Sequence, residues 1–388
     1  MSWWAIDLLL SLLVLPVLPA LVDLVPSIRA AGADRFVIPE PCPLIDDFTV
    51  LVPIYGDIRY LENAEYLAAY GNRVTLCTTT VETDDFNVAL ESIAARHGFA
   101  IYRAEGTEGV TPGKRQVAGT IRDQIIRGAT RLVSSQYVVC IDADTTTVQP
   151  LGELVGALVA NNLDLASVRL VPTNTKRLLG RLQAHEYRMA MRMRRVIPYL
   201  CTGALQVSKA HVHREIMGRH SLFFQGNDAE MGLLGHALGF RVGYLPFEVS
   251  TAVPDRFWPW WRQRVAWSGG EFRLFIINFK LFRRHPFFTL YGAVVVIGLW
   301  PLRLEQGWHP GVSILSMMVI YLIAVTYVNW QHRDWALFVY PVYGLFYNIV
   351  LVPLGLFSYL RMALAHKNYG MIDNCRSSAS IHQWILTR

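Results

Sequence analysis

The sequence predicts an α/β domain, with a mostly parallel sheet and flanking helices, joined to α-helical transmembrane segments at both ends. The first observation is composition: 53% of the 388 residues are hydrophobic, the mean hydropathy is +0.28 and 17% are charged, whereas soluble domains carry about 25% charged residues. The second is that the apolar residues are concentrated near the two ends. The third is that short apolar runs alternate with helical patterns in the middle, which is typical of βαβ units. This composition excludes a disordered chain and argues against an ordinary soluble enzyme.

The first apolar segment, residues 3–25, is long enough to cross a bilayer and carries only Asp7 and Asp23 as charges. Its start has no Lys or Arg, unlike a signal peptide. Because Arg29 and Arg35 follow it, the positive-inside rule predicts an outside N-terminus and a cytoplasmic domain after the span. We therefore expect a multi-pass protein of the plasma or inner membrane.

Three further apolar stretches occupy residues 286–302, 310–329 and 335–360, with tryptophans near their ends. Such interfacial aromatics are typical of membrane helices, with buried core helices as the alternative. The last stretch contains Pro341 and Pro353, so a broken or re-entrant segment is also compatible with it. The side of the membrane on which the C-terminus lies therefore stays open.

These patterns divide the chain into five parts. They are an N-terminal transmembrane helix (1–27), the α/β domain (28–254), amphipathic interfacial helices (255–285), C-terminal transmembrane helices (286–365) and a tail (366–388). The interfacial part is predicted because residues 257–275 mix four tryptophans with three arginines, as helices in the headgroup plane do.

Five apolar runs in the middle domain predict strands, with helical patterns between them. The strands are expected at residues 47–55, 72–79, 136–142, 163–172 and 240–246, and the helices at 61–69, 86–97, 114–128 and 151–161. In this kind of alternation, ligands bind at the carboxyl ends of the strands.

Two clusters suited to a metal and to phosphate lie near these strand ends. Asp142 and Asp144 directly follow a predicted strand and can converge on a hard divalent cation that also binds phosphate, or can form a solvated turn. Lys114 and Arg115 follow Gly113 at the start of a helical pattern. Helix-start N–H groups and two cations suit an anionic phosphate, although an ordinary charge cluster is the alternative.

Other acidic clusters allow two interpretations each. Glu82, Asp84 and Asp85 follow the second strand and can accept hydrogen bonds from a nucleobase or ribose, or cap the next helix. Asp228 opens another helical run, where it can be an N-cap or a general base opposite the metal site. Gln263 and Trp267 share one helix face, at an active site or in a plain membrane anchor.

The net charge of +6 includes basic clusters at residues 188–195 and 283–284, beside apolar stretches. This placement favours anionic headgroups and a phosphorylated substrate as partners, and not nucleic acid.

The order of the clusters resembles that of membrane-embedded family-2 glycosyltransferases, which include hyaluronan, chitin and cellulose synthases and ceramide glucosyltransferase. Between Thr49 and Trp267 the chain contains Pro-x-Tyr, acids after the second strand, Gly-Lys-Arg, Asp-x-Asp, Thr-Gly-Ala, Gly-Asn-Asp and Gln-x-x-x-Trp, with apolar spans behind them. The resemblance implies a GT-A fold for the α/β domain and inversion at the anomeric carbon.

On the donor side, the resemblance implies a UDP-sugar and a divalent cation, Mg²⁺ or Mn²⁺. Asp142 and Asp144 would bind the metal, with Asp144 as the more direct ligand. Tyr55 would pack on the uracil. The other residues expected to contact the nucleotide are Asp84 or Asp85, with Glu82 as a weaker candidate, and Lys114 and Arg115.

On the acceptor side, the resemblance makes Asp228 the catalytic base. Thr202 and Gly203 would line the acceptor end, and Gln263 and Trp267 would hold the diphosphate and the acceptor.

Two positions depart from the family pattern. Asn227 replaces a glutamate before the base, a change that we expect to be tolerated. Ala266 stands where the family has an arginine, and Arg264 or Arg262 is expected to supply the missing charge to the donor.

The function expected from the resemblance is sugar transfer from a UDP-sugar to a glycan acceptor at the membrane, by a processive polysaccharide synthase. A single transfer to a membrane lipid is the first alternative, and the missing arginine favours it. A non-catalytic membrane scaffold or permease is the second alternative.

Overall fold

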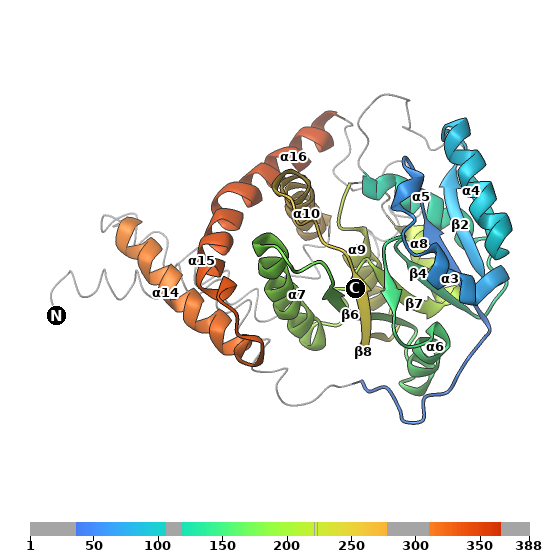
Figure 1. Ribbon diagram of the computed structural model, residues 1–388, viewed down its shortest axis with the longest axis horizontal. Helices are drawn as coiled ribbons and strands as arrows, with labels where there is room; N and C mark the ends of the chain where they lie inside the picture. Colours follow the sequence, from blue (N-terminus) through green and yellow to red (C-terminus); the bar gives the residue numbers. More distant parts are fainter. Residues whose placement is uncertain (1–35, 106–117, 221, 223, 278–309, 366–388) are drawn as a thin grey trace.

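The computed structural model describes residues 36–105, 118–220, 222, 224–277 and 310–365. The spans predicted at 1–27 and 286–302, the tail, and the phosphate candidates Lys114 and Arg115 lie outside these residues. Figure 1 shows an α/β body whose helices α7 and α10 separate the sheet from the C-terminal helices α14, α15 and α16.

The described part of the body contains one eight-stranded sheet with the order β3-β2-β1-β4-β7-β6-β8-β5. The strands are β1 (Phe48–Pro53), β2 (Val74–Thr79), β3 (Ala100–Ala104), β4 (Tyr137–Ile141), β5 (Thr146–Thr147), β6 (Leu165–Pro172), β7 (Leu205–Lys209) and β8 (Val242–Thr251). The five predicted strands correspond to β1, β2, β4, β6 and β8. The short strands β3, β5 and β7 were not predicted, because none of them forms a long apolar run.

The sheet is mixed, which corrects the prediction of a mostly parallel one. β1, β2, β3 and β4 are parallel, but β7 runs antiparallel to both β4 and β6, and β5 runs antiparallel to β8. Instead of crossing the sheet as in a βαβ unit, the chain passes from β6 through α7 (Leu178–Val196) and re-enters the sheet at the edge where β6 ended. The loop before β7 therefore lies at the same edge as the carboxyl ends of β1, β2 and β4.

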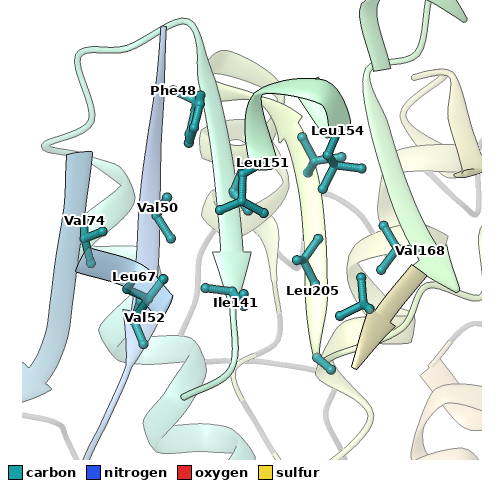
Figure 2. Close-up of a cluster of buried hydrophobic side chains, with 14 of the residues drawn as sticks. Phe48, Val50, Val52, Leu67, Val74, Ile141, Leu151, Leu154, Val168 and Leu205 are labelled. Carbon is teal, nitrogen blue, oxygen red and sulfur yellow. The ribbon is translucent and has the colours of Figure 1, made fainter. Parts of the chain in front are cut away.

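The main core lies between this sheet and helix α6 (Leu151–Ala160). Figure 2 shows Val50, Ile141 and Leu205, from three adjacent strands, near Leu151 and Leu154 of α6, and all five side chains are fully buried. Each such side chain contributes about 1.5–3 kcal/mol relative to an exposed one. This burial fixes the register of the strands and so the positions of the loops at their ends.

The remaining helices of the body are short or of moderate length. They are α3 (Ala64–Leu67), α4 (Asp84–His97), α5 (Ala118–Thr130), α8 (Ala210–Arg219) and α9 (Asn227–Ala237), with 3-10 turns at Ile58–Tyr60 and Ala68–Arg73. Thr83 caps α4 by accepting a hydrogen bond from Phe86 N at 3.3 Å, so neither Asp84 nor Asp85 is the cap. α7 and α8 were not predicted from the sequence.

Residues 257–275 were predicted to form a helix in the headgroup plane. They belong to helix α10 (Phe257–Ile277), which packs against other parts of the chain on two sides. Its residues Gly269 and Gly270 allow close contact: a Cβ atom on Gly270 would lie 2.7 Å from the backbone of Gln225, and one on Gly269 would lie 2.8 Å from the Gly355 oxygen. α10 therefore holds the loop before α9 on one side and α16 on the other.

The C-terminal region contains α14 (Pro310–Val328), a 3-10 turn (Trp330–His332), α15 (Ala336–Phe346), a π-helical turn (Tyr347–Leu351) and α16 (Val352–Ala365). The two apolar stretches predicted at 310–329 and 335–360 are thus helical. Among the helices that the structure describes, none combines the length and the apolar character required to cross a membrane. The sequence-based prediction of spans is not confirmed in this part of the chain.

Candidate active site

The Asp-x-Asp turn after β4 is held in place from its backbone side. Buried Asn63 donates from Nδ2 to the carbonyl oxygens of Asp142 at 2.9 Å and Thr145 at 2.7 Å, and its own N–H donates to the Ala143 carbonyl at 3.1 Å. The backbone of the turn is therefore fixed by hydrogen bonds, while the carboxylates of Asp142 and Asp144 remain half-buried.

The two carboxylates differ in their surroundings. Asp142 Oδ1 accepts hydrogen bonds from Nε and Nη2 of Arg122 at 3.2 and 3.0 Å. Asp144 Oδ1 accepts one from the Thr145 hydroxyl at 3.1 Å. Burial, and then the charge of Asp142, raise the pKa of Asp144 to about 6. Asp142 is paired with Arg122, whereas no cation of the described residues pairs with Asp144, so the Asp144 carboxylate is the less neutralised of the two, as a cation site requires.

Asp228 faces the same edge from the first turn of α9. It lies against Gly203, because a Cβ atom on that glycine would be 3.2 Å from Asp228 Oδ2. Arg122 Nη2 donates to the Gly203 carbonyl at 3.1 Å and so joins this loop to Asp142. The two predicted centres, the Asp-x-Asp pair and the base, therefore lie around one guanidinium group.

The electrostatics of Asp228 suit a general base. Burial raises the pKa of Asp228, while the guanidinium groups of Arg194 and Arg122 lower it. The carboxyl group is thus more basic than one in water but is kept from becoming fully neutral.

The predicted nucleotide residues are brought together in part. Tyr55 follows β1, and burial raises the pKa of its phenol, with Arg122, Asp142 and Glu82 among the charges that act on it. Glu82 is held by the N–H of Gly56 at 2.9 Å and the hydroxyl of Thr79 at 2.8 Å.

Asp84 and Asp85, which the sequence favoured over Glu82, are exposed in the first turn of α4. The geometry therefore favours Glu82, whose carboxylate is held beside the end of β1.

On the acceptor side, Thr202 is buried, and its Oγ1 makes no hydrogen bond with any described residue. Trp267 is half-buried on α10, and Oε1 of Gln263, one turn earlier, is buried without a hydrogen bond inside the described part of the chain.

Arg264 occupies a different position from the one expected. Its guanidinium is fully buried, with Nη2 3.0 Å from Glu186 Oε2 and 3.0 Å from Gln183 Oε1, and its Cζ lies 4.3 Å from the centre of the Trp267 ring. Arg262 is exposed. The structure therefore places Arg264 under Trp267 and does not support either arginine as the replacement for the one missing at Ala266.

Sequence reasoning missed Arg122, Arg194 and Asn63. Arg194 belongs to the basic cluster at 188–195, which pointed to headgroups and a phosphorylated substrate but not to Asp228. Arg122 and Asn63 gave no signal, since each lies inside a helical pattern and belongs to no recognised motif.

The residues present fit a divalent cation bound together with a substrate. Across the described residues there is no group of three or more His, Cys, Asp or Glu side chains that could hold a metal. Two carboxylates are available at Asp142 and Asp144, and Mg²⁺-type sites commonly combine one or two carboxylates with substrate phosphates.

Comparisons with known proteins bear on the family and the fold of the chain. Residues 137–360, more than half of the chain, match the family described as glycosyl transferase family group 2. No curated protein matches the chain by sequence.

Among solved structures, the chain is similar to a mannosyltransferase from Pyrobaculum calidifontis in complex with GDP-Man and Mn²⁺. The identity is 17%, the TM-score is 0.50, and the match covers 98% of this chain and 95% of that one. It also matches glucosyl-3-phosphoglycerate synthase from Mycobacterium tuberculosis, at 17% identity and a TM-score of 0.36, over 59% of this chain and 78% of that one. The first similarity supports the glycosyltransferase GT-A fold, and the second is too low to add to it. On the match over residues 137–360, the chain belongs to glycosyl transferase family group 2.

Proposed function

We propose that the protein is an inverting glycosyltransferase that moves a sugar from a nucleoside diphosphate to an acceptor hydroxyl, with Asp228 as the base. The observation that carries the proposal is the convergence of Asp142 and Asp228 on Arg122, at a sheet edge shared with Tyr55 and Glu82. A family-2 chain with this arrangement has the parts needed for donor binding and for proton removal.

On the donor side, Asp142 and Asp144 would hold Mg²⁺ or Mn²⁺, which neutralises the charge that develops on the leaving diphosphate. Arg122 contributes a fixed positive charge beside Asp142. Tyr55 offers an aromatic surface to the base, and Glu82 offers carboxylate oxygens to it or to the ribose. UDP is the nucleotide implied by the family resemblance, and GDP-Man, the ligand of the archaeal mannosyltransferase, is the other donor to test.

On the acceptor side, Asp228 takes the proton of the attacking hydroxyl as the new glycosidic bond forms. A positioned general base is worth about 10²–10⁴ in rate. Gly203 leaves room beside the carboxylate, because any side chain there would meet Asp228. The acceptor would thus approach between the loop before β7 and the Trp267 face of α10.

A single transfer is favoured over processive polymer synthesis. The processive motif of the family contains an arginine where this chain has Ala266, and Arg264 is bound to Glu186 instead of facing the donor. Processive synthesis, the first expectation from the sequence, becomes the second candidate and rests on the Gly-Lys-Arg and Thr-Gly-Ala patterns.

We further propose that the protein acts at a membrane, with the α/β body on the cytoplasmic side. The support is the apolar segment 3–25, which has Asp7 and Asp23 as its charges and is followed by Arg29 and Arg35, and a stripe of exposed apolar side chains on α14. This stripe recurs every fourth residue and consists of Leu315, Val319, Ile323 and Tyr327. Contiguous exposed apolar surface of this kind marks a site of contact with lipid or protein.

The test of the activity is donor turnover by the purified full chain. UDP- and GDP-sugars are supplied with Mn²⁺, and nucleotide release is measured with and without a chelator and in Asp228→Asn. We expect release that needs the metal and falls at least 10²-fold in Asp228→Asn. Glu215→Gln, exposed on α8, is the control for loss of one negative charge. Wild-type release in Asp228→Asn contradicts the role of Asp228, whereas no release by the wild-type chain with any donor favours the scaffold alternative.

The size of the product separates the two kinds of transfer. Mass spectrometry of a reaction with membrane lipid extract should show one added sugar per acceptor. A ladder of products longer than two sugars would instead establish the processive alternative.

A further inference from the structure

Two neighbouring residues of α5 reach the two halves of the active site. Arg122 contacts Asp142 and the Gly203 carbonyl, whereas Asp123 contacts Asn227, the residue before the base. We infer that Arg122 and Asp123 are positioning residues that set the distance between the Asp-x-Asp carboxylates and Asp228. The inference rests on the proposed function and assigns a role to α5 that no sequence motif indicated.

The guanidinium group of Arg122 donates hydrogen bonds to two different segments of the chain. Both Nε and Nη2 lie within 3.2 Å of Asp142 Oδ1, and Nη2 also donates to the Gly203 oxygen at 3.1 Å. The side chain is 17% exposed, so it is held mainly by protein contacts. Only a planar group with several donors can satisfy both acceptors at once, which a lysine ammonium would do poorly.

The Asp123 half lies beneath the base and is almost fully buried, with 4% of the side chain exposed. Asn227 Nδ2 donates to Asp123 Oδ1 at 2.6 Å. His220 completes the contact, since its Nε2 lies 3.0 Å from the Asn227 carbonyl oxygen and its Nδ1 lies 3.7 Å from Asp123 Oδ2. The first turn of α9 is thereby tied to α5 by side chains, independently of the helix packing.

This arrangement gives a physical reason for the departure at Asn227. A glutamate there, as in the family pattern, would place a second carboxylate against Asp123 in a buried environment, where like charges repel strongly. An amide supplies the N–H donor that Asp123 needs. In this chain, an amide that donates a hydrogen bond to Asp123 therefore stands where the family has a glutamate.

Because the two residues are adjacent on one helix, they act as a rigid bridge. α5 packs against β1, β2 and β3 of the sheet and against the neighbouring helices α8 and α9. A displacement of α9 relative to β4 would have to break a contact of Arg122 or of Asp123. The bridge therefore fixes the geometry that in-line attack requires, where an error of about 1 Å can cost on the order of 10²-fold in rate.

The first experiment compares variants that keep or remove each contact. Arg122→Lys keeps the charge but not the fork, Arg122→Gln removes both, and Asn227→Asp replaces a donor by an acceptor of nearly the same shape. We expect kcat to fall about 10-fold in Arg122→Lys and on the order of 10²-fold in Arg122→Gln and Asn227→Asp, with the KM for the donor changing less than threefold in Asn227→Asp. Arg131→Gln, exposed just after α5, is the matched control and should keep the wild-type rate.

A second readout separates positioning from a loss of fold. The charged groups that act on Asp228 are Arg122 and Asp123 of α5, Arg194 of α7 and Arg273 of α10, with the Cys201 thiol also nearby. Removing the charge of Arg122 should move the acidic limb of the pH–rate profile to higher pH, whereas Arg122→Lys should leave that limb unchanged. Melting temperatures confirm that each variant is folded at the assay temperature.

The inference is overturned if folded Arg122→Gln and Asn227→Asp keep kcat within twofold of the wild type. In that case Asp228→Asn still loses turnover and the proposed function stands. If Asp228→Asn turns over at the wild-type rate, the proposed function itself has failed. A variant that does not fold is replaced by Arg122→Lys, whose kcat must then fall about 10-fold for the inference to hold.

Discussion

The buried ion pair between Glu186 and Arg264 offers a quantitative test of the structure. Arg264 is fully buried, and Glu186 is the sole carboxylate within 4.0 Å of it among the described residues. Replacing Glu186 by glutamine keeps the shape of the side chain but leaves a buried cation without a counter-charge. Such a change costs about 3–5 kcal/mol, and the lower end applies because the Glu186 side chain is 26% exposed. A loss of about 3 kcal/mol corresponds to a fall in melting temperature of roughly 6–12 °C for a protein of a few hundred residues.

A double-mutant cycle separates the ion pair from the other contacts of Glu186. Thermal unfolding is measured for Glu186→Gln, Arg264→Met and the double variant, with Glu248→Gln as the control. Glu248 also pairs with an arginine, Arg169 at 3.0 Å, but its side chain is 59% exposed, so its loss should cost less than about 1 kcal/mol. The reasoning about the buried pair is wrong if Glu186→Gln lowers the free energy of unfolding as much in the Arg264→Met background as in the wild type. It is also wrong if Glu186→Gln lowers that free energy no more than the control Glu248→Gln does.

Three further perturbations test the site and its supports. Gly270→Ala should lower kcat at least 10-fold and destabilise the protein by about 1–3 kcal/mol, because its Cβ would lie 2.7 Å from the backbone of Gln225; an unchanged rate would contradict this contact. Burial lowers the pKa of His213 to about 4, so the unfolded state binds the proton first and stability should be lost as pH falls from about 6.5 to 4; His213→Gln should reduce that loss in pH-dependent melting curves. Asn63→Ala removes the hydrogen bond to the Asp142 carbonyl and should raise the Mn²⁺ concentration needed for half-maximal activity, and an unchanged Mn²⁺ titration would contradict that support.

The parts of the fold that could be predicted are those in which local pattern and burial agree. β4 is fully buried and reads as an unbroken apolar run, so both the strand and the position of Asp142 at its end followed from the sequence. The direction of β7 could not be predicted, since it depends on how α7 returns the chain to the sheet. For the same reason the sheet was expected to be mostly parallel.

The candidate site shows the same division between local and non-local information. The place of Asp228 in the first turn of a helix could be predicted, because a helix start is encoded within a few residues of sequence, whereas its role as the base stays a proposal. The preference for Asp84 and Asp85 over Glu82 did not take into account that α4 begins at Asp84, where both aspartates are exposed, and it stays a prediction. The sequence suggested that Arg264 could supply a charge to the donor, because sequence spacing does not reveal its contact with Glu186, a residue about 80 positions earlier on another helix.

The close approach at Gly269 and Gly270 determines how this chain can be divided for study. A fragment that ends at residue 254, where the globular domain was expected to end, would contain Asp228 but not the helix surface on which the preceding loop rests. A fragment that ends before Val352 would keep α10 but expose its face toward α16. Expression of a minimal catalytic unit therefore has to extend through α16, and shorter versions would report on a loosened loop and not on the native enzyme.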